Sequence, residues 1–215
     1  MGFIGNILDM AAPPSDARAP APPPLDALQS LVNTWFGRVT TGEGDEGLQS
    51  PADLARWCRE RGTDIADREV AGPDLEVARA VREGIRAALA RHNDAEQPAD
   101  VAALDRLDQV AAGLQLHTAF DGGGSGPRLE PHDSTPVRRL MATLLGTAVL
   151  ADRDRTWQRL KVCREPRCRA AFYDTSRNNS GVWCSMSACG AAAKQRAFVE
   201  RRRAKNAAAR RAAAP

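Results

Sequence analysis

Apolar residues recur at helical spacing through most of the chain between residues 25 and 157. The first such stretch begins near Leu25, and Gly42 and Gly44 end it, because glycine interrupts a helical pattern. The apolar positions of this predicted first helix are Leu28, Leu31, Val32, Trp35 and Phe36.

The next helix carries its own start signal. Ser50 is suited to cap it, Pro51 to occupy its first position and Asp53 to lie in its first turn. Gly62 ends this predicted helix. Its inner face holds Leu54, Trp57 and Cys58. Because Cys58 stands alone on an apolar face, we interpret it as a packed core residue.

Three further helices are predicted downstream. One spans about residues 73–93, a second begins near Asp100, and a third is capped by Thr135 and Pro136 and continues toward Trp157. We expect the apolar stripes of these helices to be buried: Leu75, Ala78, Val81, Ile85, Ala88 and Leu89; Val101, Leu104, Leu107, Val110 and Ala111; and Val137, Leu140, Met141, Leu144, Leu145 and Ala148.

Between the second and third of these helices, the helical spacing of apolar residues gives way to the alternating pattern that is typical of a β-strand. Leu114, Leu116, Thr118 and Phe120 alternate, a glycine-rich turn spans residues 122–126, and residues 128–130 supply a return strand. We therefore predict a mainly α N-terminal domain with a small β-hairpin, an α+β fold class. It contains no phosphate-binding glycine motif that opens a helix after a strand.

Composition predicts where the folded part of the chain begins and ends. Residues 11–24 are rich in Pro and Ala, so we predict a disordered leader at residues 1–24. The helical regulatory domain then occupies residues 25–157, a four-cysteine finger residues 158–206 and a disordered tail residues 207–215. We expect each of the two folded parts to have its own core.

The chain has 215 residues, of which 43% are hydrophobic and 27% charged. This composition excludes collagen-like and fully disordered classes, and no apolar run approaches the ~20 residues that span a bilayer. The N-terminus has no recognisable targeting signal. We expect a cytoplasmic, nucleoid-associated protein without a membrane partner, whose cysteines are kept reduced.

The last four cysteines form two pairs. Cys163 and Cys168 are separated by four residues, as are Cys184 and Cys189, and 15 residues lie between the pairs. Two such loops can converge on a tetrahedral ion, so we predict one structural Zn2+ bound by four thiolates. Two disulfides and four unrelated core thiols are the alternatives, which the spacing and the absence of a secretion signal disfavour.

The segments around the cysteines predict the form of the finger. Residues 170–174 and 182–185 are expected to pair as a hairpin, because residues 177–181 carry a turn signal between them. Residues 191–205 are good helix formers that follow the last cysteine. Knuckle, hairpin and helix in this order predict a treble-clef-like zinc finger with a basic C-terminal helix.

Charge is distributed unevenly. Residues 153–211 hold 16 Lys+Arg and 4 Asp+Glu, a net charge of +12, while the rest of the chain has 14 basic and 23 acidic residues, a net charge of −9. A basic segment on an acidic body is typical of polyanion binding, because each cation near a phosphate releases counterions. The candidate nucleic-acid contacts are Arg177 at the hairpin tip and Lys194, Arg196, Arg201, Arg202, Arg203 and Lys205 on the final helix.

These residues resemble the CGNR-type zinc finger of bacterial transcription regulators. The resemblance rests on the four cysteines, residues 172–178, residues 183–186, Cys189-Gly190 and residues 194–196. Residues 31–35 and 48–57 resemble the ABATE domain of stress-induced transcription regulators. Together the resemblances imply a DNA-binding regulator. The motif that names the finger is Cys-Gly-Asn-Arg, whereas Ala191 and Ala192 follow Cys189-Gly190 here.

Other functions remain open at this point. An RNA-binding module would stack bases on Tyr173 or Trp183, although packing beneath the metal site is the more frequent role of such a tryptophan. A protein-interaction module stapled by zinc is a further alternative. We expect no enzyme, because four cysteines close the metal shell and no histidine belongs to a His-x-Glu deaminase motif. A homodimer and a small-molecule effector also stay open.

Overall fold

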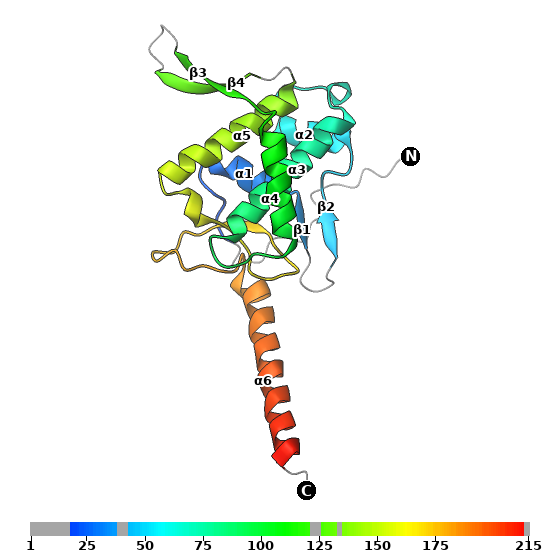
Figure 1. Ribbon diagram of the computed structural model, residues 1–215, viewed down its shortest axis with the longest axis vertical. Coiled ribbons are helices and arrows are strands. Elements are labelled where there is room, and N and C mark those ends of the chain that lie inside the picture. The colour runs from blue at the N-terminus through cyan, green and yellow to red at the C-terminus, as the bar shows by residue number, and fades with distance from the viewer. Residues whose placement is uncertain (1–17, 38–42, 121–125, 133–134, 213–215) are drawn as a thin grey trace.

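A computed structural model describes residues 18–37, 43–120, 126–132 and 135–212 of the chain. Within these residues the fold is mixed α/β, with six α-helices and small antiparallel hairpins. The long helix α6 (Ala191–Ala212) extends from one end of a helical body, and the β3–β4 hairpin extends from the other (Figure 1). None of the helices described is long and apolar enough to cross a membrane.

Three helices form the centre of the body. α1 (Leu25–Val32), α3 (Gly72–Ala90) and α5 (Pro136–Arg153) contact one another and bury the apolar stripes expected of them. The start of α5 is the predicted one, because the Thr135 hydroxyl accepts a hydrogen bond from the backbone N–H of Arg138. These three helices provide the surface on which the remaining elements pack.

α2 (Pro51–Glu60) begins with a complete capping box, as its sequence predicts. The Ser50 hydroxyl accepts from the N–H of Asp53, and the Asp53 carboxylate accepts from the N–H of Ser50. A short 3-10 turn, η2 (Asp67–Glu69), follows α2. Cys58 is fully buried in the core, as expected, and burial raises the pKa of its thiol to about 11.

The first helix is shorter than the sequence predicts. It ends at Val32, because Asn33 caps it and the Thr34 hydroxyl donates to the carbonyl of Leu31. Trp35 and Phe36 then belong to strand β1 (Trp35–Gly37), which pairs antiparallel with β2 (Gly44–Glu46). Gly44 is therefore a strand residue rather than a helix stop.

α4 (Ala99–Ala111) begins where the sequence predicts, and its expected face packs on the core at Leu107 and Val110 but not at Val101. It packs on α3, yet Val101 is 66% exposed and the one buried residue of α4 is Asp100. The carboxylate of Asp100 turns inward to meet Arg169. Since neighbouring helical residues lie about 100° apart, burying Asp100 directs Val101 toward solvent.

The predicted hairpin is present, with a first strand that begins later than the alternation and a return strand that is longer than predicted. β3 (Leu116–Phe120) pairs antiparallel with β4 (Pro127–Pro131) and contacts α5. Most of its residues are at least half-exposed, and Phe120 is 77% exposed.

The second predicted hairpin has a different partner. β6 (Ala171–Tyr173) pairs antiparallel with β5 (Leu160–Val162), which follows the 3-10 turn η3 (Trp157–Arg159), and not with residues 182–185. Residues 174–181 fold around the carboxylate of Asp174, which accepts hydrogen bonds from the N–H groups of Ser176 and Gly181. This loop leaves residues 182–185 without a strand partner.

The core crosses the boundary between the two predicted domains. Leu160, Val162, Ala171 and Tyr173 belong to the same buried cluster as α1, α3 and α5. The expectation of two separate cores is therefore wrong for the β5–β6 hairpin. The strands are too short and too apolar to be stable alone, and α1 and α3 cover them.

Both predicted disordered ends contain ordered residues. Ala21 is buried and its N–H donates to the side chain of Gln29 over 2.6 Å, so Ala21 packs on α1, whereas Arg18 contacts Asp174 and Trp183. At the other end α6 continues to Ala212. The remaining residues of the predicted leader and tail, 1–17 and 213–215, lie outside the described part of the chain.

Candidate metal centre

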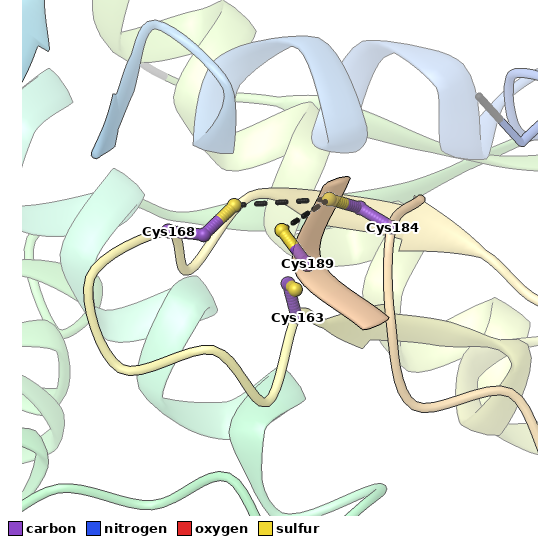
Figure 2. A group of neighbouring side chains, drawn as sticks. All are labelled: Cys163, Cys168, Cys184 and Cys189. Atoms are coloured by element: carbon purple, nitrogen blue, oxygen red, sulfur yellow. Dashed lines mark hydrogen bonds between the residues drawn. The ribbon is translucent and has the colours of Figure 1, made fainter. Parts of the chain in front are cut away.

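Four cysteines converge where the β5–β6 hairpin meets the start of α6. Cys163 follows β5, Cys168 precedes β6, Cys184 lies in the loop after β6, and Cys189 lies in the π-helical turn η4 (Met186–Gly190) that leads into α6. All four Sγ atoms lie within 4.8 Å of one another (Figure 2). No other group of three or more Cys, His, Asp or Glu side chains in the described ranges converges in this way.

The spacing of the sulfur atoms fits zinc. The Sγ atom of Cys184 lies 3.7 Å from that of Cys168 and 3.6 Å from that of Cys189. In a tetrahedral site with Zn–S bonds of about 2.3 Å, neighbouring sulfurs are separated by about 3.8 Å. Cys163, Cys168 and Cys189 are buried and Cys184 is half-buried, so the four cysteines can bind one zinc ion in a closed shell.

The electrostatics of the cluster favour a cation. Hydrogen bonds from Cys168, Cys184 and Cys189 lower the pKa of the Cys163 thiol, while hydrogen bonding to Cys163 raises the pKa values of Cys184 and Cys189. Cys184 and Cys189 thus stabilise a thiolate at Cys163 but resist ionising themselves. A divalent cation removes this conflict, because it offsets the repulsion among four negative sulfurs.

Local backbone geometry shapes the knuckle between the first two cysteines. The N–H of Cys163 donates to the carbonyl of Ala170, and the N–H of Cys168 donates to that of Glu165. Arg169 adopts a left-handed conformation with φ of 53°, which reverses the chain into β6. The two cysteines therefore face the same point from opposite sides of one tight turn.

Residues at the end of α1 and in β1 attach this knuckle to the helical body. The side-chain amide of Asn33 donates to the carbonyl of Ala171 over 2.9 Å and accepts from its N–H over 2.7 Å. The N–H of Gly37 donates to the carbonyl of Cys168 over 2.9 Å. A Cβ at Gly37 would lie 1.6 Å from the carbonyl oxygen of Arg167, so only glycine allows this approach.

Side chains from α3 and α4 complete the attachment. Buried Arg86 donates to the carbonyls of Arg169 and Val32, and Arg169 forms an ion pair with Asp100 at 2.8 Å. The Nδ1 atom of His92 lies 2.7 Å from the carbonyl oxygen of Leu160. Burial lowers the pKa of His92, which favours the neutral ring with Nδ1–H as the donor.

An interior ion pair organises the loop that carries Arg177. Lys161 is buried in β5, and its ammonium donates to the Asp174 carboxylate over 2.9 Å and to the carbonyls of Asn179 and Gly181. Arg18 forms a second ion pair with Asp174 at 3.1 Å. Burial opposes ionisation of Asp174, but the hydrogen bonds from Lys161 and Ser176 outweigh it and hold the pKa of this carboxyl well below its usual range.

The candidate nucleic-acid contacts fall into two groups. Arg177 is exposed on the loop after β6, and five of the predicted cations on α6 are exposed: Lys194, Arg201, Arg202, Arg203 and Lys205. Arg196 differs, because its guanidinium forms an ion pair with the carboxylate of Glu165, a side chain only 1% exposed. Arg196 therefore attaches α6 to the zinc knuckle.

Several of these residues had no sequence signal that identified their role. Lys161 lies between Leu160 and Val162, and a lone cation within an apolar strand is the one local hint that it is buried. Asp174, Glu165 and Arg18 gain their partners only through tertiary contacts. Tyr173 is buried, so it offers no open face for base stacking, while Trp183 is half-buried against the cysteine cluster.

Two family models match the chain, one after the other. Residues 17–160 match ABATE, described as "Putative stress-induced transcription regulator", and residues 159–202 match zf-CGNR, described as "CGNR zinc finger". The first match covers more than half of the chain. A comparison with curated proteins found no match.

Proposed function

Since the chain belongs to the ABATE family and carries a CGNR zinc finger, we propose that it is a zinc-binding, DNA-binding transcriptional regulator. In this proposal the zinc site holds the basic helix α6 against duplex DNA, and the ABATE domain receives a signal or forms a homodimer. In this proposal the zinc is structural and not catalytic, because four thiolates leave it no open position for water.

The position of Arg196 is the observation that most directly supports the DNA contact. Its ion pair with Glu165 fixes which side of α6 faces the knuckle. At about 100° per residue, Lys194, Arg201 and Lys205 lie on the opposite side, and Arg202 lies beside them. Phe198, which is 59% exposed, falls among these cations. These cations thus lie on the side of α6 that faces away from the knuckle, while exposed Arg203 shares the side of Arg196.

Zinc supports this arrangement in two ways. Cys189 lies in the turn immediately before α6, so the metal fixes the start of the helix. The positive end of the helix dipole and its free N–H groups also face the thiolates. We assign the order of knuckle, loop and helix to the treble-clef-like class. The metallated cluster has a charge of −2, and the finger stays basic.

The electrostatics favour contacts to phosphates over contacts to bases on α6. The helix has cations on most of its exposed surface and lacks the Asn and Arg of the CGNR motif at Ala191 and Ala192. Arg177 stands on a loop ordered by the Lys161–Asp174 pair, which makes it the better candidate for reading a base. RNA is the second candidate, and burial of Tyr173 removes one of its two stacking surfaces.

The proposal is tested by fluorescence anisotropy with zinc-loaded full chain. A fluorescent DNA duplex and an RNA hairpin of equal length are titrated at fixed salt. The variant Lys194→Ala/Arg201→Ala/Lys205→Ala should bind the duplex at least about tenfold more weakly, because three phosphate contacts are lost. The control Arg61→Ala/Arg68→Ala/Arg106→Ala removes the same charge from exposed sites on the body.

Three outcomes are distinguishable. Loss of duplex binding in the α6 variant alone supports the proposal. Equal loss in both variants indicates a response to net charge and contradicts a specific role of α6. Tighter binding of the RNA hairpin than of the duplex overturns DNA as the partner.

A further inference from the structure

A cavity of about 310 Å³ lies beside the β1–β2 hairpin and α2, away from the cysteine cluster. Phe36, Leu48 and Trp57 supply its apolar lining. The indole N–H of Trp57 donates to the Ser30 hydroxyl over 3.0 Å, which fixes the ring in place. The volume is at the lower end of the range for small-molecule sites, about 300–1,000 Å³.

The polar lining of the cavity is acidic. Asp45, Glu46, Asp53 and Glu60 contribute four carboxylates, and Arg56 contributes the one guanidinium among the lining residues. Arg82 approaches from outside the cavity and holds Glu46 through two hydrogen bonds of 2.6 and 2.7 Å. With Arg82 included, the formal charge is −2.

Existing contacts keep two of these carboxylates ionised. Burial opposes ionisation of Glu46, but hydrogen bonds from Arg82 and from the N–H of Leu48 outweigh it and lower its pKa. Asp53 likewise has a lowered pKa, because hydrogen bonds from Ser50 and Arg56 outweigh its burial. Glu60 is exposed at the edge of α2. An occupant therefore meets aromatic surface beside fixed negative charge.

We propose that this cavity binds a small organic cation with an apolar or aromatic body, such as an amine that carries a ring. Trp57 and Phe36 contact the body of the ligand, and Glu60 attracts its charged group. Aromatic faces also attract cations directly. An anion of the same shape is repelled by the lining. This inference rests on the proposed function, for which it supplies the signal that the ABATE domain receives.

The same elements connect the cavity to the zinc knuckle. Asn33 lines the cavity and pairs through its side chain with the backbone of Ala171 in β6. Phe36 lines the cavity, and the N–H of the next residue, Gly37, donates to the carbonyl of Cys168. A ligand that restrains β1 therefore also restrains the segment that carries a metal ligand, and it should slow the release of zinc.

Calorimetric titration of the zinc-loaded full chain tests the binding site without nucleic acid. The probes are phenethylammonium and benzyltrimethylammonium, with phenethyl alcohol as the neutral control and phenylacetate as the anionic control. We expect saturable binding of one cation per chain and at least about tenfold weaker binding of the controls. Glu60→Gln should weaken the cations about three- to tenfold, whereas Glu96→Gln, an exposed carboxylate outside the cavity, should not.

Binding of neutral or anionic probes as tight as that of the cations overturns the ligand class. Absence of saturable binding of both cations up to about 10 mM overturns the site. Because no DNA is present, these outcomes are independent of the DNA-binding proposal, and failure to bind DNA leaves them unchanged.

The connection to zinc has its own readout, the rate at which a chromophoric chelator removes the metal. With the cavity saturated by phenethylammonium, this rate should fall about two- to tenfold. It should stay unchanged with phenylacetate, and in the Glu60→Gln chain the same fall should require about three- to tenfold more phenethylammonium. An unchanged rate in the saturated wild-type chain overturns the connection.

Discussion

The side chain of Asn33 pairs with the backbone of Ala171 as a neighbouring strand would, donating to its carbonyl over 2.9 Å and accepting from its N–H over 2.7 Å. Asn33 ends α1 in the ABATE domain, while Ala171 opens β6 beside the zinc knuckle. One amide therefore satisfies the free edge of a strand in the finger. This contact explains why the two family segments share one core.

Replacing Asn33 by Ala should destabilise the whole chain. The buried N–H of Ala171 would lose its partner, at a cost of about 1–3 kcal/mol. The C=O of Ala171 would keep only the hydrogen bond of 3.3 Å from the side chain of Gln29. Urea unfolding followed by circular dichroism should show a lower midpoint with an unchanged slope. The control Asn178→Ala changes an exposed loop residue and should stay within about 0.5 kcal/mol of the wild type. Equal stability of both variants would contradict the importance of this pairing.

Zinc removal should destabilise the helical body as well as the finger, because Leu160, Val162, Ala171 and Tyr173 belong to the common core. Chelation, or Cys184→Ser, should lower the temperature of one cooperative thermal transition. Cys58→Ala is the matched control, because Cys58 is buried away from the cluster and its variant should retain one zinc per chain by elemental analysis. Two separate transitions, with the helical one unaffected by chelation, would refute this expectation.

Asp174 should contribute to acid sensitivity. Its pKa is lowered in the folded chain, so its stabilisation is complete above the unfolded value of about 3.9 and is lost as the pH falls from there through the folded pKa. Asp174→Asn removes this dependence and leaves the Lys161 ammonium buried without its counter-charge, at a cost of about 3–5 kcal/mol.

Urea unfolding at pH 7 and at intervals down to pH 3 measures the effect of Asp174→Asn. The double variant Lys161→Met/Asp174→Asn is the control, because it removes both charges and should recover part of the lost stability. A single variant as stable as the wild type at pH 7 would show that the pair contributes little.

Contacts to phosphate predict a characteristic salt dependence of DNA binding. Arg201→Ala should lower affinity for all duplex sequences about equally, and should reduce the slope of log K against log[salt] by about 0.9. The Arg177→Ala variant should instead lose about 1–3 kcal/mol of discrimination between the correct base and a wrong base at one position of the DNA site. Anisotropy titrations at several salt concentrations measure both effects. An unchanged slope for Arg201→Ala would place that side chain away from the phosphates.

Local sequence signals located most of the helices and the candidate site. The Ser50 and Thr135 caps fixed the starts of α2 and α5, because a cap depends on residues within one turn. The spacing of the cysteines identified all four candidate zinc ligands, and their sulfur atoms converge in the structure. Such features are encoded over a few residues and need no tertiary information.

The features that the sequence did not reveal depend on distant partners. Trp35 and Phe36 suit a helix by spacing, but pairing with residues 44–46 makes them a strand. The partner of β6 is β5 and not the residues after the turn, because the interior pair of Lys161 and Asp174 folds the intervening loop. Arg196 had the same sequence signal as its basic neighbours, and only the buried carboxylate of Glu165 distinguishes it.

The most direct test of the proposed function is recovery of the genomic DNA fragments bound to the chain in the cells that make it. The proposal predicts enrichment of a limited set of sites that share a sequence, and loss of that enrichment in the Lys194→Ala/Arg201→Ala/Lys205→Ala variant at equal protein level. Uniform coverage of the genome, or enrichment that persists in this variant, would contradict a regulator that binds its sites through the zinc-anchored helix.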